Sequence, residues 1–160
     1  MARYGIATLF EDYPDGHEFT EANTPLHLTH VDVLNIDLEP DKFISRLTNH
    51  LRQELQFSIV PIKDTNYGPN KDIPVTEIEL NPSILGFHKR LMDFLVSGGA
   101  TFDNPQFLNE SYSPHISIYG TRRVKISVPI KVKSVSIGNK RTDIDNPPNR
   151  IIATIPLLAS

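Results

Sequence analysis

Two short tripeptides place a histidine two positions before a hydroxyl side chain, with an aliphatic residue between them. The two are His27-Leu28-Thr29 and His115-Ile116-Ser117, and each comes soon after a proline. Side chains alternate between the two faces of a β-strand, so the histidine and the hydroxyl of each tripeptide project from one face. The aliphatic residue then points into the core. Each tripeptide is therefore predicted to present an imidazole and an alcohol side by side.

Two imidazoles and two alcohols that converge on one space suit a tetrahedral phosphate. The alcohols donate hydrogen bonds to the non-bridging oxygens, one neutral imidazole removes a proton from the attacking oxygen, and an imidazolium protonates the leaving oxygen. Histidine takes both roles because its ordinary pKa of about 6.5 lets both protonation states coexist near neutrality. The pattern predicts this chemistry if the two strands lie side by side, with the imidazoles about 6–8 Å apart to admit one phosphate.

A structural role is the alternative for each histidine taken alone. A histidine on a half-buried strand is more often a hydrogen-bonded structural residue than a catalyst, but the paired context favours a site for His27 and His115. His30 is expected to face away from His27, which makes it a structural or a surface residue. The same geometry argues against a zinc site on those two histidines, and the absence of cysteine excludes thiolate ligands. We expect neither a metal nor a cofactor.

Two further candidates for substrate binding lie just past the second tripeptide. Tyr119 shares the alternation of His115 and Ser117, so it can stack on a nucleobase, an interaction worth about 1–3 kcal/mol. Filling space at the rim of the site is the alternative for this tyrosine. Arg122 can attract a phosphate, although a solvated turn charge is the alternative there.

The expected elements follow the order strand, strand, helix, strands, helix, strands. Alternation and turn residues predict strands at about 3–10, 26–34, 57–62, 75–80, 114–119, 124–137 and 150–157. Apolar spacing predicts one helix that runs from an acidic cap to about residue 55 and a second at about 83–97. This order lacks the regular alternation of a parallel sheet, so it predicts an α+β fold with two antiparallel sheets and helices on their outer faces. Residues 1–160 are expected to form a single domain.

The paired tripeptides, on strands in the two halves of a chain of this size, resemble the two-histidine (2H) phosphoesterase superfamily. The similarity is to its branch of 2′-5′ RNA ligase-like proteins and cyclic phosphodiesterases. It implies a bilobal fold with pseudo-two-fold symmetry around a central cleft, no metal, and 2′,3′-cyclic or 2′-5′-linked nucleotide substrates. It also implies that His27 and His115 are the acid and base pair and that Thr29 and Ser117 bind the phosphate.

Charge is divided unevenly along the chain. Residues 1–110 contain 17 Asp and Glu against 8 Lys and Arg, whereas residues 111–160 contain 2 against 8. The basic residues of the second segment are Arg122, Arg123, Lys125, Lys131, Lys133, Lys140, Arg141 and Arg150. Such asymmetry draws an anionic ligand to one side of a protein, with solvated surface charges as the alternative. The net charge of −3 disfavours the wrapping of a long duplex, so a small phosphorylated ligand or a short RNA end fits better.

The composition, with 39% apolar and 22% charged residues, is that of an ordinary soluble globular domain. No stretch approaches about 18 uninterrupted apolar residues, and the first residues lack the apolar core of a signal peptide. We therefore expect a cytoplasmic monomer that does not associate with membranes. The expected partners are RNA ends or a small nucleotide substrate.

The leading hypothesis is a metal-independent phosphodiesterase that acts on 2′,3′-cyclic phosphate or on 2′-5′-linked RNA and nucleotides. Hydrolysis of cyclic oligonucleotide signals is a close alternative. A module that binds nucleotides or RNA without turnover is an alternative from another class, and a structural domain with coincidental histidines is the third. The sequence does not assign which histidine is the acid and which is the base.

Overall fold

A computed structural model describes residues 2–20, 23–140 and 149–159 of the chain. Its strands are β1 (Ala2–Leu9), β2 (Glu18–Phe19), β3 (His27–Ile36), β4 (Phe57–Ile59), β5 (Pro61–Tyr67), β6 (Ile73–Ile78), β7 (Thr101–Phe102), β8 (His115–Ser117), β9 (Ile130–Val132), β10 (Ser134–Asn139) and β11 (Asn149–Pro156). Its helices are α1 (Pro40–Leu51) and α2 (Pro82–Ser97), with short 3₁₀ turns at Pro105–Phe107 and Asn109–Ser111. The basic residue Arg141 lies outside the described residues.

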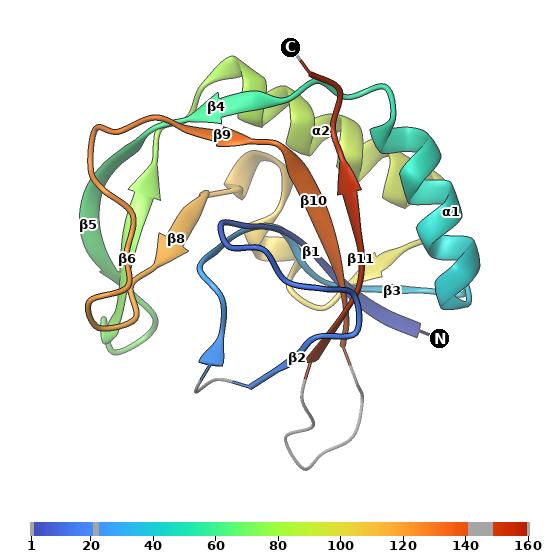
Figure 1. Ribbon diagram of the computed structural model, residues 1–160, viewed down its shortest axis with the longest axis horizontal. Helices are drawn as coiled ribbons and strands as arrows, with labels where there is room; N and C mark the ends of the chain where they lie inside the picture. The colour runs from blue at the N-terminus through green and yellow to red at the C-terminus, as the bar shows by residue number, and fades with distance from the viewer. Residues whose placement is uncertain (1, 21–22, 141–148, 160) are drawn as a thin grey trace.

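Nine of these strands form one large antiparallel sheet, and β4 pairs with β9 in a second sheet of two strands. The large sheet runs β2-β11-β10-β1-β3-β8-β6-β5, with β7 added beside β3 (Figure 1). Its middle is the contact between β3 and β8. This contact joins a half built on β1, β3, β10 and β11 to a half built on β5, β6 and β8. The predicted α+β fold with antiparallel strands is confirmed.

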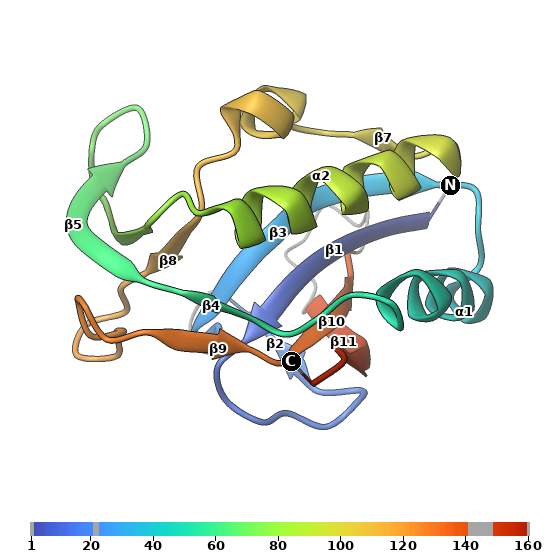
Figure 2. The same ribbon diagram turned by 90° about the horizontal axis from the view of Figure 1, so that it is seen from above.

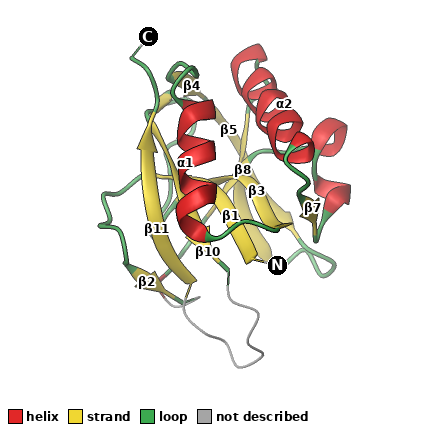
Figure 3. Cartoon of the chain, turned by 90° about the vertical axis from the view of Figure 1, so that its right-hand side faces the viewer, coloured by secondary structure: helices red, strands yellow, loops and turns green. Residues whose placement is uncertain are grey.

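Both helices cover the same face of the large sheet (Figure 2 and Figure 3). Tyr4 of β1 stacks on Phe43 of α1 with ring centroids 4.3 Å apart. His30 of β3 meets Phe87 of α2 edge-on at 5.0 Å. The described helices leave the other face of the sheet uncovered, and we call it the open face. None of the described helices is long and apolar enough to span a membrane.

Helix α1 ends at Leu51, earlier than the end near residue 55 that the apolar spacing predicted. The chain turns there, and the N–H of Glu54 donates to the carbonyl of Leu51 at 3.0 Å. The turn buries Glu54, whose carboxylate accepts hydrogen bonds from Arg90 of α2 at 2.8 and 2.9 Å. Leu55, at the expected end of the helix, is 55% exposed. The longer helix was a wrong prediction because a tertiary ion pair determines where the helix stops.

The strand expected at residues 124–137 is divided into β9 and β10, and the first of these begins only at Ile130. Ser127 has a φ of 67°, in the left-handed region that interrupts a strand. Its N–H donates instead to the carbonyl of Pro61 at 2.8 Å. Pro129 adds a second interruption, because proline has no N–H for a strand ladder.

A local irregularity in β3 decides which of its side chains face away from the helices. The register of β3 against β1 shifts beside Thr29 and Val31. Two successive residues, His30 and Val31, are consequently both buried. The bulge brings Asp32 back to the open face of the sheet, where it lines the same cleft as Thr29.

Candidate active site

The two tripeptides lie next to each other on β3 and β8. Leu28 faces Ile116 across this antiparallel pair, and both are fully buried. The register places each histidine opposite the hydroxyl residue of the other strand, as the pairs His27–Ser117 and Thr29–His115. All four polar side chains project from the open face of the sheet. We call them the two-histidine cluster, and a local two-fold axis through the Leu28–Ile116 pair relates its halves.

The two histidines stand diagonally across the strand pair. Residues in such positions on one face of an antiparallel pair lie about 7–8 Å apart, with their Cβ atoms somewhat closer. This spacing is compatible with the separation of about 6–8 Å that one phosphate between two imidazoles requires. The two-fold arrangement also sets one hydroxyl beside each imidazole, as phosphate binding from both sides demands.

Both histidines are oriented by the same hydrogen bond. Nδ1 of His27 lies 2.8 Å from the carbonyl oxygen of Pro25, and Nδ1 of His115 lies 2.8 Å from the carbonyl oxygen of Ser113. A carbonyl only accepts, so Nδ1 is the protonated nitrogen in both neutral rings. Nε2 of each ring is thereby left with its lone pair for a ligand. The carbonyl two residues before each histidine fixes both the tautomer and the direction of the ring.

The environment of His27 favours its neutral form. Burial lowers the pKa of the His27 imidazole below its ordinary value of 6.5, and the Pro25 carbonyl opposes this effect. The positive charges of Lys140 and His115 lower the pKa of His27 further, against a smaller opposing effect of Asp32. The electrostatic effect of His115 on His27 agrees with their placement around one space. A neutral His27 is suited to accept a proton at neutral pH.

An aromatic ring holds the opposite histidine in place. Tyr67 meets the His115 ring edge-on, with centroids 4.8 Å apart. The Tyr67 hydroxyl is 2.9 Å from Oγ of Ser113 and donates to Glu77 at 3.3 Å. Glu77 of β6 lies opposite His115 in the strand register. The β5–β6 hairpin therefore supports His115 from the side that faces away from β3.

Two cavities flank the two-histidine cluster. The His27-side cavity, of about 230 Å³, is lined by His27, Thr29 and residues of β1, β10 and β11. The His115-side cavity, of about 560 Å³, is lined by His115, Thr29 and residues from the 67–73 turn and the 104–113 segment. Thr29 and Asp32 line both cavities, so these are two parts of one cleft.

Sequence reasoning did not single out Lys140, which lines the His27-side cavity. It follows β10, and its backbone N–H donates to the carbonyl of Arg3 at 2.9 Å. Lys140 was only one of eight basic residues in the second segment. One feature of the sequence does point to Lys140. It lies two positions after Gly138, so its side chain continues the alternation of β10 toward the open face of the sheet.

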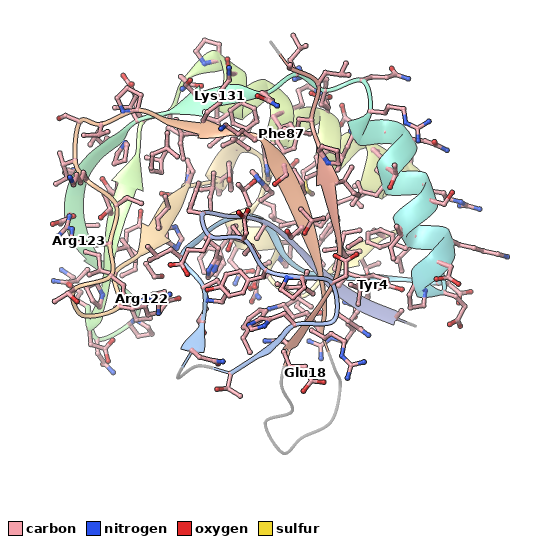
Figure 4. All side chains as sticks on the ribbon, in the orientation of Figure 1. Tyr4, Glu18, Phe87, Arg122, Arg123 and Lys131 are labelled. Carbon is pink, nitrogen blue, oxygen red and sulfur yellow. The ribbon has the colours of Figure 1, made fainter. Side chains whose placement is uncertain are left out.

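Tyr119 and Arg122 form a small unit beyond the end of β8. Their backbones pair with each other in a tight turn, and the Arg122 guanidinium lies over the Tyr119 ring at 5.7 Å. Arg122 donates to the carbonyl of Thr24 at 3.2 Å and lies 3.6 Å from the carboxylate of Glu11. Figure 4 places Arg122 with Arg123 at the β5–β6 end of the molecule. Neither Tyr119 nor Arg122 lines the two cavities, and their role in substrate binding stays a prediction.

Two other histidines are buried between the sheet and α2. His30 is 1% exposed, and its Nε2 lies 2.7 Å from Oγ1 of Thr8. Thr8 donates its own proton to the carbonyl of Ser134, so His30 must donate from Nε2. His88 of α2 is buried and stacks on Tyr112 with ring centroids 3.9 Å apart. The burial of His30 supports a structural role, which was one of the two roles expected for it.

The described residues contain no group of three or more His, Asp or Glu side chains that could hold a metal ion. His27 and His30 point to opposite faces of β3, as the alternation predicted. Among the described residues that line the cleft, the polar side chains are imidazoles, hydroxyls, the amides of Asn104 and Asn149, the carboxylate of Asp32 and the ammonium group of Lys140.

Comparison with known proteins relates this chain to solved phosphoesterase structures. No family model matches the sequence, and no curated protein matches it. The fold is similar to that of a crystal structure described as a phosphoesterase, with a TM-score of 0.61 at 11% identity over 98% of both chains. E. coli LigT complexed with 3′-AMP gives a TM-score of 0.60 at 11% identity over 98% of both chains. TT0787 of Thermus thermophilus gives 0.63 at 14% identity over 99% of both chains.

The chain thus has the fold of LigT and of the phosphoesterases that share it. The similarity extends over almost the full length of every compared chain, so it includes both halves of the sheet. This is the architecture that the resemblance in the sequence implied.

Proposed function

We propose that this protein is a phosphodiesterase that uses His27 and His115 as an acid and base pair, without a metal, on 2′,3′-cyclic phosphate or 2′-5′-linked RNA and nucleotides. The observation that carries the proposal is the paired register of β3 and β8. This register, with Nδ1 of each histidine bonded to a backbone carbonyl, supports a site in which the two imidazoles and the two hydroxyls bind one phosphate. The likeness of the fold to LigT, which has been crystallised with 3′-AMP and with phosphate, supports the same kind of ligand.

In this mechanism the phosphate binds between the two histidines. Thr29 and Ser117 donate hydrogen bonds to its non-bridging oxygens. Neutral His27 accepts a proton from the attacking water through Nε2, while the water oxygen bonds to phosphorus. The bond from phosphorus to the leaving oxygen breaks, and protonated His115 supplies that oxygen with a proton from Nε2. One water is consumed, and the two histidines exchange protonation states until solvent restores them.

The assignment of His27 as the base rests on its surroundings. Burial and the nearby cation Lys140 disfavour the charged form of His27. His115 is in contact with Tyr67, whose hydroxyl points at Glu77, so an acidic group lies on the side of His115 away from the cleft.

The His115-side cavity suits the nucleoside of the substrate. It is the larger of the two, and Tyr67, Ile73, Phe107 and Tyr112 are among its lining residues. Ile73 and Phe107 are 48% and 62% exposed, so they present apolar surface at its rim. Aromatic and aliphatic surface of this kind binds the flat face of a nucleobase.

The test is a comparison of four substrates with the purified protein in excess chelator. Nucleoside 2′,3′-cyclic monophosphate, a 2′-5′-linked dinucleotide, its 3′-5′-linked isomer and a cyclic dinucleotide are each incubated, and the products are separated by chromatography. The proposal expects turnover of one of the first two. Turnover of the cyclic dinucleotide alone would favour the signal-degrading alternative. Tight binding of a 2′-phosphorylated nucleotide with no product would favour a binding module.

A further inference from the structure

Lys140 is a cation of the cleft that acts on His27 through its charge and that the proposed mechanism provides with no ligand. Its side chain lies across the open face of β1, directly over Gly5. A Cβ atom built on Gly5 would lie 2.8 Å from Cε of Lys140 and 2.7 Å from the backbone oxygen of Asp32. Both contacts are shorter than real Cβ atoms tolerate, so the missing side chain at Gly5 makes room for the lysine stem.

Lys140 forms no ion pair with another described residue. Five arginines of the described residues have carboxylate partners, in the pairs Arg3–Asp103, Arg90–Glu54, Arg122–Glu11, Arg123–Asp64 and Arg150–Glu18. Within the part of the chain that the structure describes, no carboxylate lies within 4.0 Å of the Lys140 ammonium group. Burial lowers the pKa of Lys140, and the Asp32 carboxylate opposes this effect from a longer distance. The cleft therefore holds a positioned ammonium group that no carboxylate of the described residues contacts directly.

Lys140 lies beside the space between the two histidines, where the reacting phosphate is proposed to bind, and on a different strand from either histidine. It enters the His27-side cavity from β10, beyond β1, whereas the two-histidine cluster stands on β3 and β8. Lys140 is nevertheless close enough to lower the pKa of His27 through its charge. An anion bound to Lys140 would lie on the side of the reacting phosphate opposite the His115-side cavity.

We propose that Lys140 binds a second phosphate of the substrate, so that the preferred substrate is a phosphodiester joining two nucleotides, with a further phosphate on the nucleotide in the His27-side cavity. This inference rests on the proposed function, because it takes the phosphate between the histidines as its reference point. The nucleoside on one side of the scissile bond occupies the larger apolar cavity. The nucleotide on the other side extends along β1 and places its own phosphate on the ammonium group of Lys140.

The experiment compares two 2′-5′-linked dinucleotides of adenosine, without and with a 3′-phosphate on the second nucleoside. Dissociation constants are measured by calorimetry in the His115→Ala background, which prevents turnover and leaves the His27-side cavity unaltered. A charge-assisted hydrogen bond predicts that the added phosphate strengthens binding roughly 10- to 100-fold. Lys140→Met is expected to abolish this gain, and Lys140→Arg to restore part of it.

The matched control is Lys131→Met, which removes an exposed lysine of β9 that belongs to the two-stranded sheet and lines neither cavity. The gain from the added phosphate should survive this change in full. Equal affinity of both dinucleotides for the background protein that retains Lys140, or an undiminished gain in Lys140→Met, would overturn the inference. Absence of turnover by the unmodified protein on every phosphodiester would instead refute the proposed function, while the calorimetric comparison still decides whether Lys140 binds a phosphate.

Discussion

Removal of either histidine imidazole is the perturbation that tests the site most directly. The structure gives His27 and His115 the same oriented Nε2, so His27→Ala and His115→Ala should each remove one proton-transfer step. Such a step contributes about 10²- to 10⁴-fold to rate, which corresponds to about 3–5 kcal/mol of transition-state stabilisation. Each variant is therefore expected to lose about 10²- to 10⁴-fold in kcat/KM on the best substrate found.

The dependence of kcat/KM on pH distinguishes the two variants. The pKa of His27 is lowered from 6.5 in the free protein, mainly by burial. A base with a lowered pKa stays deprotonated as the pH falls, so the acidic limb of the profile should lie below pH 6.5. The residual activity of His115→Ala should retain this acidic limb, and that of His27→Ala should lack it.

The assay is initial-rate measurement from about pH 4.5 to about 9, with folding checked by circular dichroism. His17→Ala serves as the control, because His17 lines neither cavity of the cleft. Retention of more than about one tenth of the activity by either cleft variant would refute the two-histidine mechanism, since one tenth is well above the activity left by the smallest loss expected. An acidic limb that persists unchanged in His27→Ala would refute the assignment of the base.

Three further outcomes follow from the same structure. Thr29→Val and Ser117→Ala each remove a hydroxyl that can donate to a charged phosphate. Each should lower kcat/KM roughly 10- to 100-fold, which corresponds to about 1.5–3 kcal/mol of lost transition-state stabilisation. Equal activity of both variants and the unmodified protein would speak against phosphate binding by these hydroxyls. Turnover should persist after dialysis against chelator, and loss of activity that returns with an added divalent ion would contradict the metal-independent scheme. The pKa of buried His30 is lowered from 6.5 to about 3, so the folded protein should lose stability as the pH falls from about 6.5 towards 3, by about 1.4 kcal/mol per pH unit at most from this group. Urea unfolding across that range should show a shallower pH dependence in His30→Gln, and an identical slope would contradict the burial of a neutral His30.

The strand alternation of the tripeptides could be predicted from the sequence, because the two-residue period needs only local information. His27 with Thr29, and His115 with Ser117, indeed share a face, and Leu28 and Ile116 are buried. The pairing of β3 with β8 could not be derived from local pattern, because it joins segments far apart in the chain. Only the resemblance to a known family connected the two tripeptides.

Residues that depend on tertiary contacts were the ones that the sequence left undetermined. Lys140 gains its position from the absence of a side chain at Gly5 and from the carbonyl of Arg3, neither of which is near it in sequence. Helix α1 stops where Glu54 meets Arg90 of the other helix, and no apolar period records that contact. Propensity and periodicity describe one segment at a time, so they do not contain these contacts.

The ladder between β3 and β8 also determines how this cleft can adapt to different ligands. Leu28 and Ile116 are buried and pair directly beneath the imidazoles, so a motion that changes the gap between His27 and His115 would have to disrupt this pair. Domain closure around a hinge, by which many bilobal enzymes grip ligands of unequal size, cannot take place at this point. Selectivity must instead reside in the loops and side chains at the two ends of the cleft, which can change without disturbing the central chemistry.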